Sequence, residues 1–232
     1  MAITFVQGGK AGIPFTANTG ASTAAFAANV AIGDLIACWM YLQNVSAAFN
    51  PNITDNVNAG NYTVDWTSYD SVDNSLLALC HIACNAIGKP SISIAGAVNY
   101  TGGNLNAAHY AGFTSTPALD SVSLNGGTGT ALNGSMTTMQ SNELVLNQTW
   151  LLTGGGFYTV PPSPWNDTFI GGGGALADPS WRTVASSGAV SSAGTYSVSA
   201  RYNTALAGFY STAPGIVTPN PFYYQRKVLY FV

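Results

Sequence analysis

The sequence predicts an all-β protein, a single antiparallel β-sandwich of jelly-roll type with long loops that occupies residues 1–232. Apolar and polar side chains alternate with a period of two in segment after segment, which is typical of strands that bury one face. Only 6% of the residues are charged while 47% are hydrophobic, so no segment could supply the charged outer face of an ordinary helix. Glycine-rich and proline-rich breaks separate the alternating runs at the intervals seen in sandwiches, and a chain of this length can form one such domain.

The first expected strands are residues 2–6, 23–28 and 34–43. The last of these is apolar on both sides, with Leu35 on one face and Ile36 on the other. Continuous apolar runs of this kind are typical of strands buried on both faces. We therefore expect a central strand that is covered once by the opposing sheet and once by loops or a partner.

Residues 61–70 alternate cleanly and predict a half-buried strand. Residues 76–84 fit a short buried helix almost as well as a strand, whereas residues 91–95 alternate cleanly after a turn at residues 88–90. A hairpin formed by these two segments is the simpler interpretation. Further strands are expected at residues 105–113, 143–152, 196–203 and 227–232.

Two long segments interrupt the strand pattern and are predicted as loops. Residues 153–174 contain two runs of glycine and several prolines, and residues 204–225 combine prolines with aromatics. Loops of this length in a compact domain are usually functional, so we interpret residues 204–225 as an extended arm that contacts neighbouring subunits. The predicted interface residues are Phe209, Tyr210, Pro214, Pro219, Pro221, Phe222, Tyr223 and Tyr224.

The two histidines, His81 and His109, each lie on an apolar strand face and are predicted to be hydrogen-bonded core residues. A hydrolase triad of His109 with Asp120 and a nearby serine is disfavoured, because the chain contains no Gly-x-Ser-x-Gly nucleophile motif. We therefore expect no catalytic residue.

The three cysteines are predicted to be free. Cys80 and Cys84 would lie about 13 Å apart on a strand, which is too far for a disulfide, although on a helix they would be adjacent. Together with Cys38 they are interpreted as small buried hydrophobic residues.

Metal and cofactor sites are not expected. Cys80, His81 and Cys84 are close in sequence but divide between opposite strand faces, without accompanying ligand motifs. The nearest approach to a calcium loop is Asp65, Asp70 and Asp73 with Asn74, for which a solvated turn is the favoured interpretation. The glycine runs also lack the Lys-Ser/Thr ending of a phosphate-binding loop.

The charge balance narrows the range of partners. Three lysines and three arginines argue against nucleic-acid binding, which needs several phosphate-neutralising side chains on one face. No apolar run is long enough to cross a membrane, and the N-terminus lacks the basic region of a signal peptide. Because a protein so poor in charge would tend to associate non-specifically, we expect much of its surface to be covered by copies of itself or by another protein.

Trp165 and Trp181 flank the second glycine run. Three interpretations stay open for them: core residues, interface anchors, or exposed rings that stack on sugars.

The order of several short motifs carries a family resemblance. They are Ile-Thr-Phe-Val-Gln at residues 3–7, Gly-Asp-Leu-Ile at 33–36, Ile-Thr-Asp at 53–55, Gly-Asn-Tyr-Thr at 60–63, His-Tyr-Ala-Gly at 109–112, Glu-Leu-Val-Leu at 143–146, Ser-Ala-Gly-Thr-Tyr at 192–196 and the closing segment 228–232. In this order they resemble a β-sandwich domain of bacterial surface proteins and tailed-phage virion proteins. The resemblance covers nearly the whole chain and departs from the family pattern at residues 204–225.

This resemblance implies a scaffold without catalytic residues or cofactors. A stand-alone copy without a signal peptide resembles a virion component, so the expected function is that of a non-enzymatic virion structural protein of a tailed phage. It would be a capsid decoration or tail-associated protein made in the host cytoplasm, with copies of itself and other virion proteins as partners. The alternative is a carbohydrate-binding module or adhesin that binds a host-surface glycan through Trp165 and Trp181.

Overall fold

The computed structural model describes residues 2–13, 20–94, 100, 102–152, 158–159, 164–167 and 180–212. Within these ranges the chain is all-β and contains no helix, and every strand pair is antiparallel. Accordingly, the described residues form no helix that could span a membrane. The predicted fold class is confirmed.

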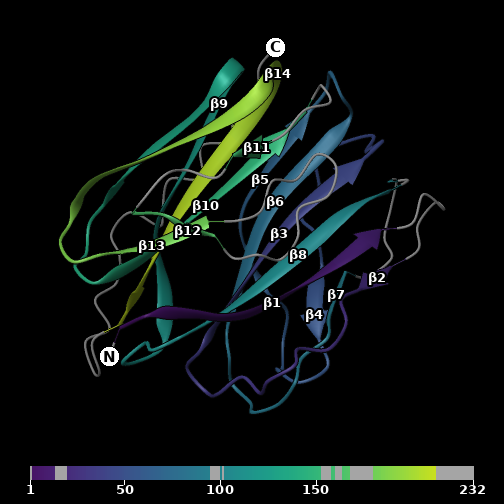
Figure 1. Cartoon of the computed structure of the whole chain (residues 1–232). Coiled ribbons are helices and arrows are strands. Elements are labelled where there is room, and N and C mark those ends of the chain that lie inside the picture. The colour runs from purple at the N-terminus through teal and green to yellow at the C-terminus, as the bar shows by residue number, and fades with distance from the viewer. Residues whose placement is uncertain are drawn as a thin grey trace.

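Three sheets make up the fold (Figure 1). The main sheet has the order β1 (Thr4–Ile13), β8 (Gly102–Ala111), β3 (Leu35–Gln43), β6 (Ser75–Ala83) and β5 (Thr63–Asp70). The second sheet has the order β11 (Tyr158–Thr159), β14 (Gly188–Ser211), β10 (Glu143–Leu151), β13 (Ser180–Val184) and β12 (Asn166–Asp167), with β9 (Pro117–Thr138) paired along β14. The small sheet has the order β2 (Ala21–Ser22), β7 (Ile92–Ile94) and β4 (Ile53–Asp55).

The main and second sheets pack face to face as a sandwich. Their shared core includes Trp39 and Leu79 from the main sheet and Leu146 and Phe209 from the second sheet. Alternate residues of β3, such as Ile36, point the other way into a core that they share with the small sheet. The prediction that β3 is covered on both faces is therefore confirmed, and its second cover is a sheet of the same chain.

β9 and β14 form the longest strand pair, seen as two curved ribbons that run side by side in Figure 1. Their pairing is interrupted between Thr195 and Ala200, where the pair bends. Beyond the bend the ribbon folds back over the second sheet, so that Met136 and Val190 share a core with Leu206 on the sheet's outer face. This fold-back buries the second face of the central strand β10.

Two expectations for the first half of the chain were wrong. Residues 23–28 are not a strand, since β2 ends at Ser22. Residues 75–83 do form a strand, β6, but β6 pairs with β3 and β5, whereas β7 pairs with β2 and β4 in the small sheet, so the predicted hairpin does not exist. The physical reason is burial: β6 is apolar on both faces and is stable only in the interior of the main sheet.

The predicted arm at residues 204–225 was also wrong at its beginning. Residues 204–211 are the last part of β14, paired with β9 on one side and β10 on the other. Phe209, predicted to lie at an interface, has no exposed surface and belongs to the sandwich core, while Tyr210 is half-buried. Six predicted interface residues lie outside the described residues: Pro214, Pro219, Pro221, Phe222, Tyr223 and Tyr224.

Two other predicted segments fall largely outside the described residues. Of the predicted loop 153–174, the structure describes residues 158–159 and 164–167, which contain the short strands β11 and β12. The strand predicted at residues 227–232 lies wholly outside.

Candidate functional site

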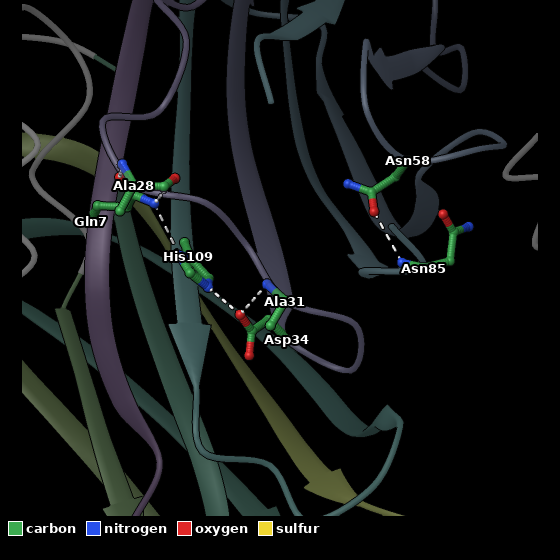
Figure 2. Close-up of polar contacts among 7 residues, drawn as sticks. All are labelled: Gln7, Ala28, Ala31, Asp34, Asn58, Asn85 and His109. Atoms are coloured by element: carbon green, nitrogen blue, oxygen red, sulfur yellow. Dashed lines mark hydrogen bonds and ion pairs between the residues drawn. The ribbon is translucent and has the colours of Figure 1, made fainter. Parts of the chain in front are cut away.

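A chain of polar side chains links β1, β8 and the segment before β3 (Figure 2). The imidazole of His109 contacts Gln7 through Nδ1 at 3.2 Å and Asp34 through Nε2 at 2.7 Å. Asp34 Oδ2 also accepts the backbone N–H of Ala31 at 2.8 Å. His109 is nearly fully buried and its ring stacks on Phe26.

The orientation of Gln7 fixes the tautomer of His109. Gln7 Oε1 accepts the backbone N–H of Ala28, and Gln7 Nε2 donates to the Ala28 carbonyl, each at 2.8 Å. Nε2 of this amide therefore faces His109 Nδ1 as a donor, so Nδ1 must accept. The ring proton then sits on Nε2 and is donated to the Asp34 carboxylate. Both nitrogens of His109 are used, and neither is left to act as a general base.

The disfavoured hydrolase triad is not formed. The acid beside His109 is Asp34, whereas Asp120 lies on β9. His81 is likewise hydrogen-bonded, through Nδ1 to Asp65 Oδ1 at 2.7 Å, and lies edge-on to Phe209. The prediction that both histidines are hydrogen-bonded is confirmed; His109 lies in the core, whereas His81 is only partly buried.

The His109 chain holds the first of three loops that meet at the end of the main sheet where β3 begins and β6 ends. We call residues 28–34, 55–60 and 84–88 the loop tip. Its first and third loops are joined by backbone hydrogen bonds, from Val30 to Gly88 at 2.7 Å and from Gly33 to Cys84 at 2.9 Å. A Cβ on Gly88 would lie 2.9 Å from the side chain of Val57, so the second loop packs closely on the third.

Two asparagines hold the second and third loops together, and Figure 2 shows their contact. The side chain of Asn58 is buried; its Oδ1 accepts the backbone N–H of Asn85 at 2.9 Å, and its Nδ2 donates to Asp55. The side chain of Asn85 contacts the second loop in turn: its Oδ1 accepts the backbone N–H of Ala59, and its Nδ2 donates to the Ala59 carbonyl. The second and third loops are thus joined by side chain to backbone hydrogen bonds instead of by a strand ladder.

The fixed loops present two aliphatic side chains to solvent. Ile32 is 68% exposed and Ile87 is 67% exposed. The hydrogen bonds on either side of them, between residues 30 and 88 and between residues 33 and 84, hold their loops in register beside each other. Both carboxylates of the tip, Asp34 and Asp55, are engaged in hydrogen bonds. The loop tip therefore exposes two isoleucines beside asparagine side chains, in loops that hydrogen bonds hold together.

Trp165 and Trp181 do not form a common stacking platform. Trp181 packs in the sandwich core, edge-on to Tyr110. Trp165 packs against the opposite, outer face of the second sheet, where the Arg182 guanidinium lies 5.7 Å from its ring centre. Since Trp181 and Arg182 are consecutive on β13, the two tryptophans lie on opposite faces of the sheet.

The acidic residues that come nearest to a calcium loop in the sequence are separated in the structure. Asp65 is directed into the sandwich by a β-bulge in β5, whereas Asp70 and Asp73 both pair with Arg201 on β14. Across the described ranges no three His, Cys, Asp or Glu side chains gather as possible metal ligands.

The three cysteines are free and buried, as predicted. Burial raises the pKa of each thiol, and it raises the pKa of Cys84 to about 12. These thiols are therefore kept protonated in the native fold, and their thiolate nucleophiles are not available.

Sequence reasoning missed the loop tip. The Asp55-Asn56-Val57-Asn58 turn could be recognised from its side chains, because Asp and Asn cap local backbone N–H groups. That this turn packs beside residues 84–88 depends on the pairing of distant strands.

No family model, no curated protein and no solved structure matches the chain.

Proposed function

We propose that this protein is a non-enzymatic structural component of a tailed-phage virion, either a capsid decoration protein or a tail-associated protein, and that it works by assembly with copies of itself and other virion proteins. The order of sequence motifs supports the virion setting. The observation that carries the assembly function is the loop tip, on which Ile32 and Ile87 are two-thirds exposed although their loops are fixed.

Physical chemistry favours this surface as a contact. Burying a largely exposed isoleucine contributes about 1–2 kcal/mol. Association also costs ordering entropy, and a surface that is already ordered by hydrogen bonds reduces that cost. The occupant that we propose for the loop tip is a second copy of this chain, because an apolar surface with little net charge meets its own copy without electrostatic repulsion.

The test is the self-association of the purified full chain, measured by sedimentation velocity over a range of concentrations. In the double variant Ile32→Asn/Ile87→Asn, self-association should weaken at least about tenfold, since two buried apolar contacts are lost. The matched control is Val72→Asn, which changes a side chain that is 74% exposed in the turn between β5 and β6, at the other end of the main sheet. A control that weakens association as much as the double variant, or a wild-type chain that stays monomeric, would contradict the loop-tip contact.

The virion setting has a separate test in the genes that flank the coding sequence. Capsid, portal or tail genes beside it would support the proposal. A neighbourhood made only of genes for metabolic enzymes would count against a virion role, whatever the self-association of the chain.

A further inference from the structure

Two carboxyl groups meet where β9, after folding back, turns into β10. Glu143 is the first residue of β10 and is fully buried, and Asp120 lies half-buried near the start of β9. Each accepts a backbone hydrogen bond from the connecting turn: Met139 donates to Asp120 Oδ2 at 2.8 Å, and Gln140 donates to Glu143 Oε1 at 2.7 Å. The two carboxyl groups therefore hold consecutive N–H groups of one turn.

The second oxygen of Glu143 has no donor among the residues that the structure describes, although it is buried. It lies in the space left by Gly208, where a Cβ would come within 2.6 Å of Oε2 and 3.8 Å of Asp120 Cβ. A buried acceptor without a donor is costly, and two carboxylates that face each other both accept. A proton on one of them turns this contact into a hydrogen bond.

The surroundings favour that proton. Burial, followed by the charge of Asp120 and a side-chain hydrogen bond with it, raises the pKa of Glu143 to about 7, although the N–H of Gln140 lowers it in part. Of the other ionisable groups on the packed strands, Arg182 lies over Trp165, and Tyr210 is two residues beyond Gly208 on β14. Further along β14, Arg201 pairs with Asp70 and Asp73, and Tyr196 and Tyr202 belong to a separate core cluster. Asp120 is the charged group that acts on Glu143.

We propose that Glu143 and Asp120 share one proton. This proton stabilises the turn between β9 and β10 and, with it, the packing of the folded-back end of β9 on the second sheet. Ser121, near the start of β9, also lies beside the end of this strand: its hydroxyl oxygen is 3.1 Å from the Thr137 carbonyl oxygen and 3.2 Å from Asp120 Oδ2. Loss of the proton leaves the buried carboxylate of Glu143 facing the half-buried carboxylate of Asp120. The turn is the part that yields, because β10 is fixed between β13 and β14.

The direction of the pH effect follows from linkage. The folded protein holds this proton up to about pH 7, whereas an unfolded glutamate releases it at its ordinary value of 4.5. Between these values the native state binds more protons than the unfolded state. The stabilisation is complete below the lower value and is lost as the pH rises through the upper one.

The experiment follows the backbone amide signals of Met139 and Gln140 by NMR in the full chain between about pH 4 and pH 9, a range that brackets both carboxyl states. In the wild type these amides should titrate together with a midpoint near the pKa of Glu143, about 7. Glu143→Gln keeps the acceptor for Gln140 and adds a permanent donor toward Asp120, so this titration should disappear. Wild-type amides that titrate only below about pH 5, or that titrate unchanged in Glu143→Gln, overturn the proposal.

Two further variants distinguish an effect of the shared proton from an effect of the protein's net charge. Asp120→Asn supplies its own donor to Glu143, so the amide midpoint should fall toward that of an ordinary glutamate. Asp73→Asn removes a carboxylate that pairs with Arg201 elsewhere and should leave the midpoint near its wild-type position. A midpoint that moves equally in both variants would show that net charge, and not the shared proton, controls the turn.

Discussion

At the scale of single residues, a chain of hydrogen-bonded side chains connects β1, β8 and the segment before β3. Gln7, His109 and Asp34 form one buried chain in which the amide sets the tautomer of the ring and the ring orients the carboxylate. The sequence was sufficient to predict that His109 would be hydrogen-bonded, because a histidine on an apolar strand face needs a partner. It did not predict Asp34 as that partner, since the two residues are 75 positions apart and meet only through the pairing of β3 with β8.

Asp34→Ala should destabilise the protein by about 1–3 kcal/mol, because it leaves the buried N–H of His109 and the N–H of Ala31 without an acceptor. The measurement is the free energy of unfolding in urea. Val72→Ala, in the exposed turn between β5 and β6, serves as the control and should change this free energy by less than about 0.5 kcal/mol, as is usual for an exposed side chain. Equal effects of the two substitutions would show that the carboxylate does not anchor the loop.

At the scale of elements, the close approach of β8 to β3 depends on a glycine. Gly103 has a φ of 153°, and a Cβ at this position would lie 2.0 Å from the carbonyl oxygen of Tyr41 on β3. Gly33, before β3, has a φ of 89° but nothing within 4 Å of the corresponding position. Substitution of Gly33 by alanine would therefore introduce backbone strain alone, whereas substitution of Gly103 would introduce strain together with a steric collision.

Gly103→Ala should cost about 3 kcal/mol or more, since the new methyl group collides with backbone inside the main sheet. Gly33→Ala should cost about 1–2 kcal/mol, the strain of a left-handed conformation alone. Thermal unfolding of the two variants and the wild type gives the order of stability. A Gly103→Ala protein as stable as Gly33→Ala would mean that β8 and β3 can separate at this point without loss.

The elements also show where strand prediction from sequence succeeds. Residues 34–43 and 143–152 were predicted within one residue of β3 and β10, because both are long and apolar on both faces. β9 was missed, since its first half is rich in glycine and polar residues and is stabilised by its pairing with β14. A strand that depends on its neighbour for stability carries little periodic signal of its own.

At the scale of the whole molecule, β14 connects the layers. Its last part lies between β9 and β10 and places Phe209 in the core between the sheets, while Leu206 faces the folded-back ribbon. Arg201, near the bend of β14, pairs with Asp70 and Asp73 at the end of the main sheet. Residues 204–211 are thus part of the scaffold, and the arm hypothesis is limited to residues 213–225.

Deletion of residues 204–225 should abolish folding, because it removes the strand between β9 and β10 together with two fully buried side chains, Leu206 and Phe209. The expected readout is loss of the cooperative unfolding transition followed by tryptophan fluorescence. Deletion of residues 213–225 removes no residue of β14 and is the matched comparison. A cooperative transition in the larger deletion would contradict the place of β14 in the core, and unchanged self-association in the smaller one would contradict the arm hypothesis.

The sequence by itself determined the fold class, the double burial of β3, the free cysteines and the hydrogen bonding of the histidines. Each of these follows from local periodicity or from the chemistry of one residue type. Only the tertiary structure decided which strands pair, that residues 204–211 lie in the core, that Trp165 and Trp181 lie on opposite faces, and that Ile32 and Ile87 share the loop tip. Those features depend on contacts between segments far apart in the chain, and a period of two is the same whichever neighbour a strand selects.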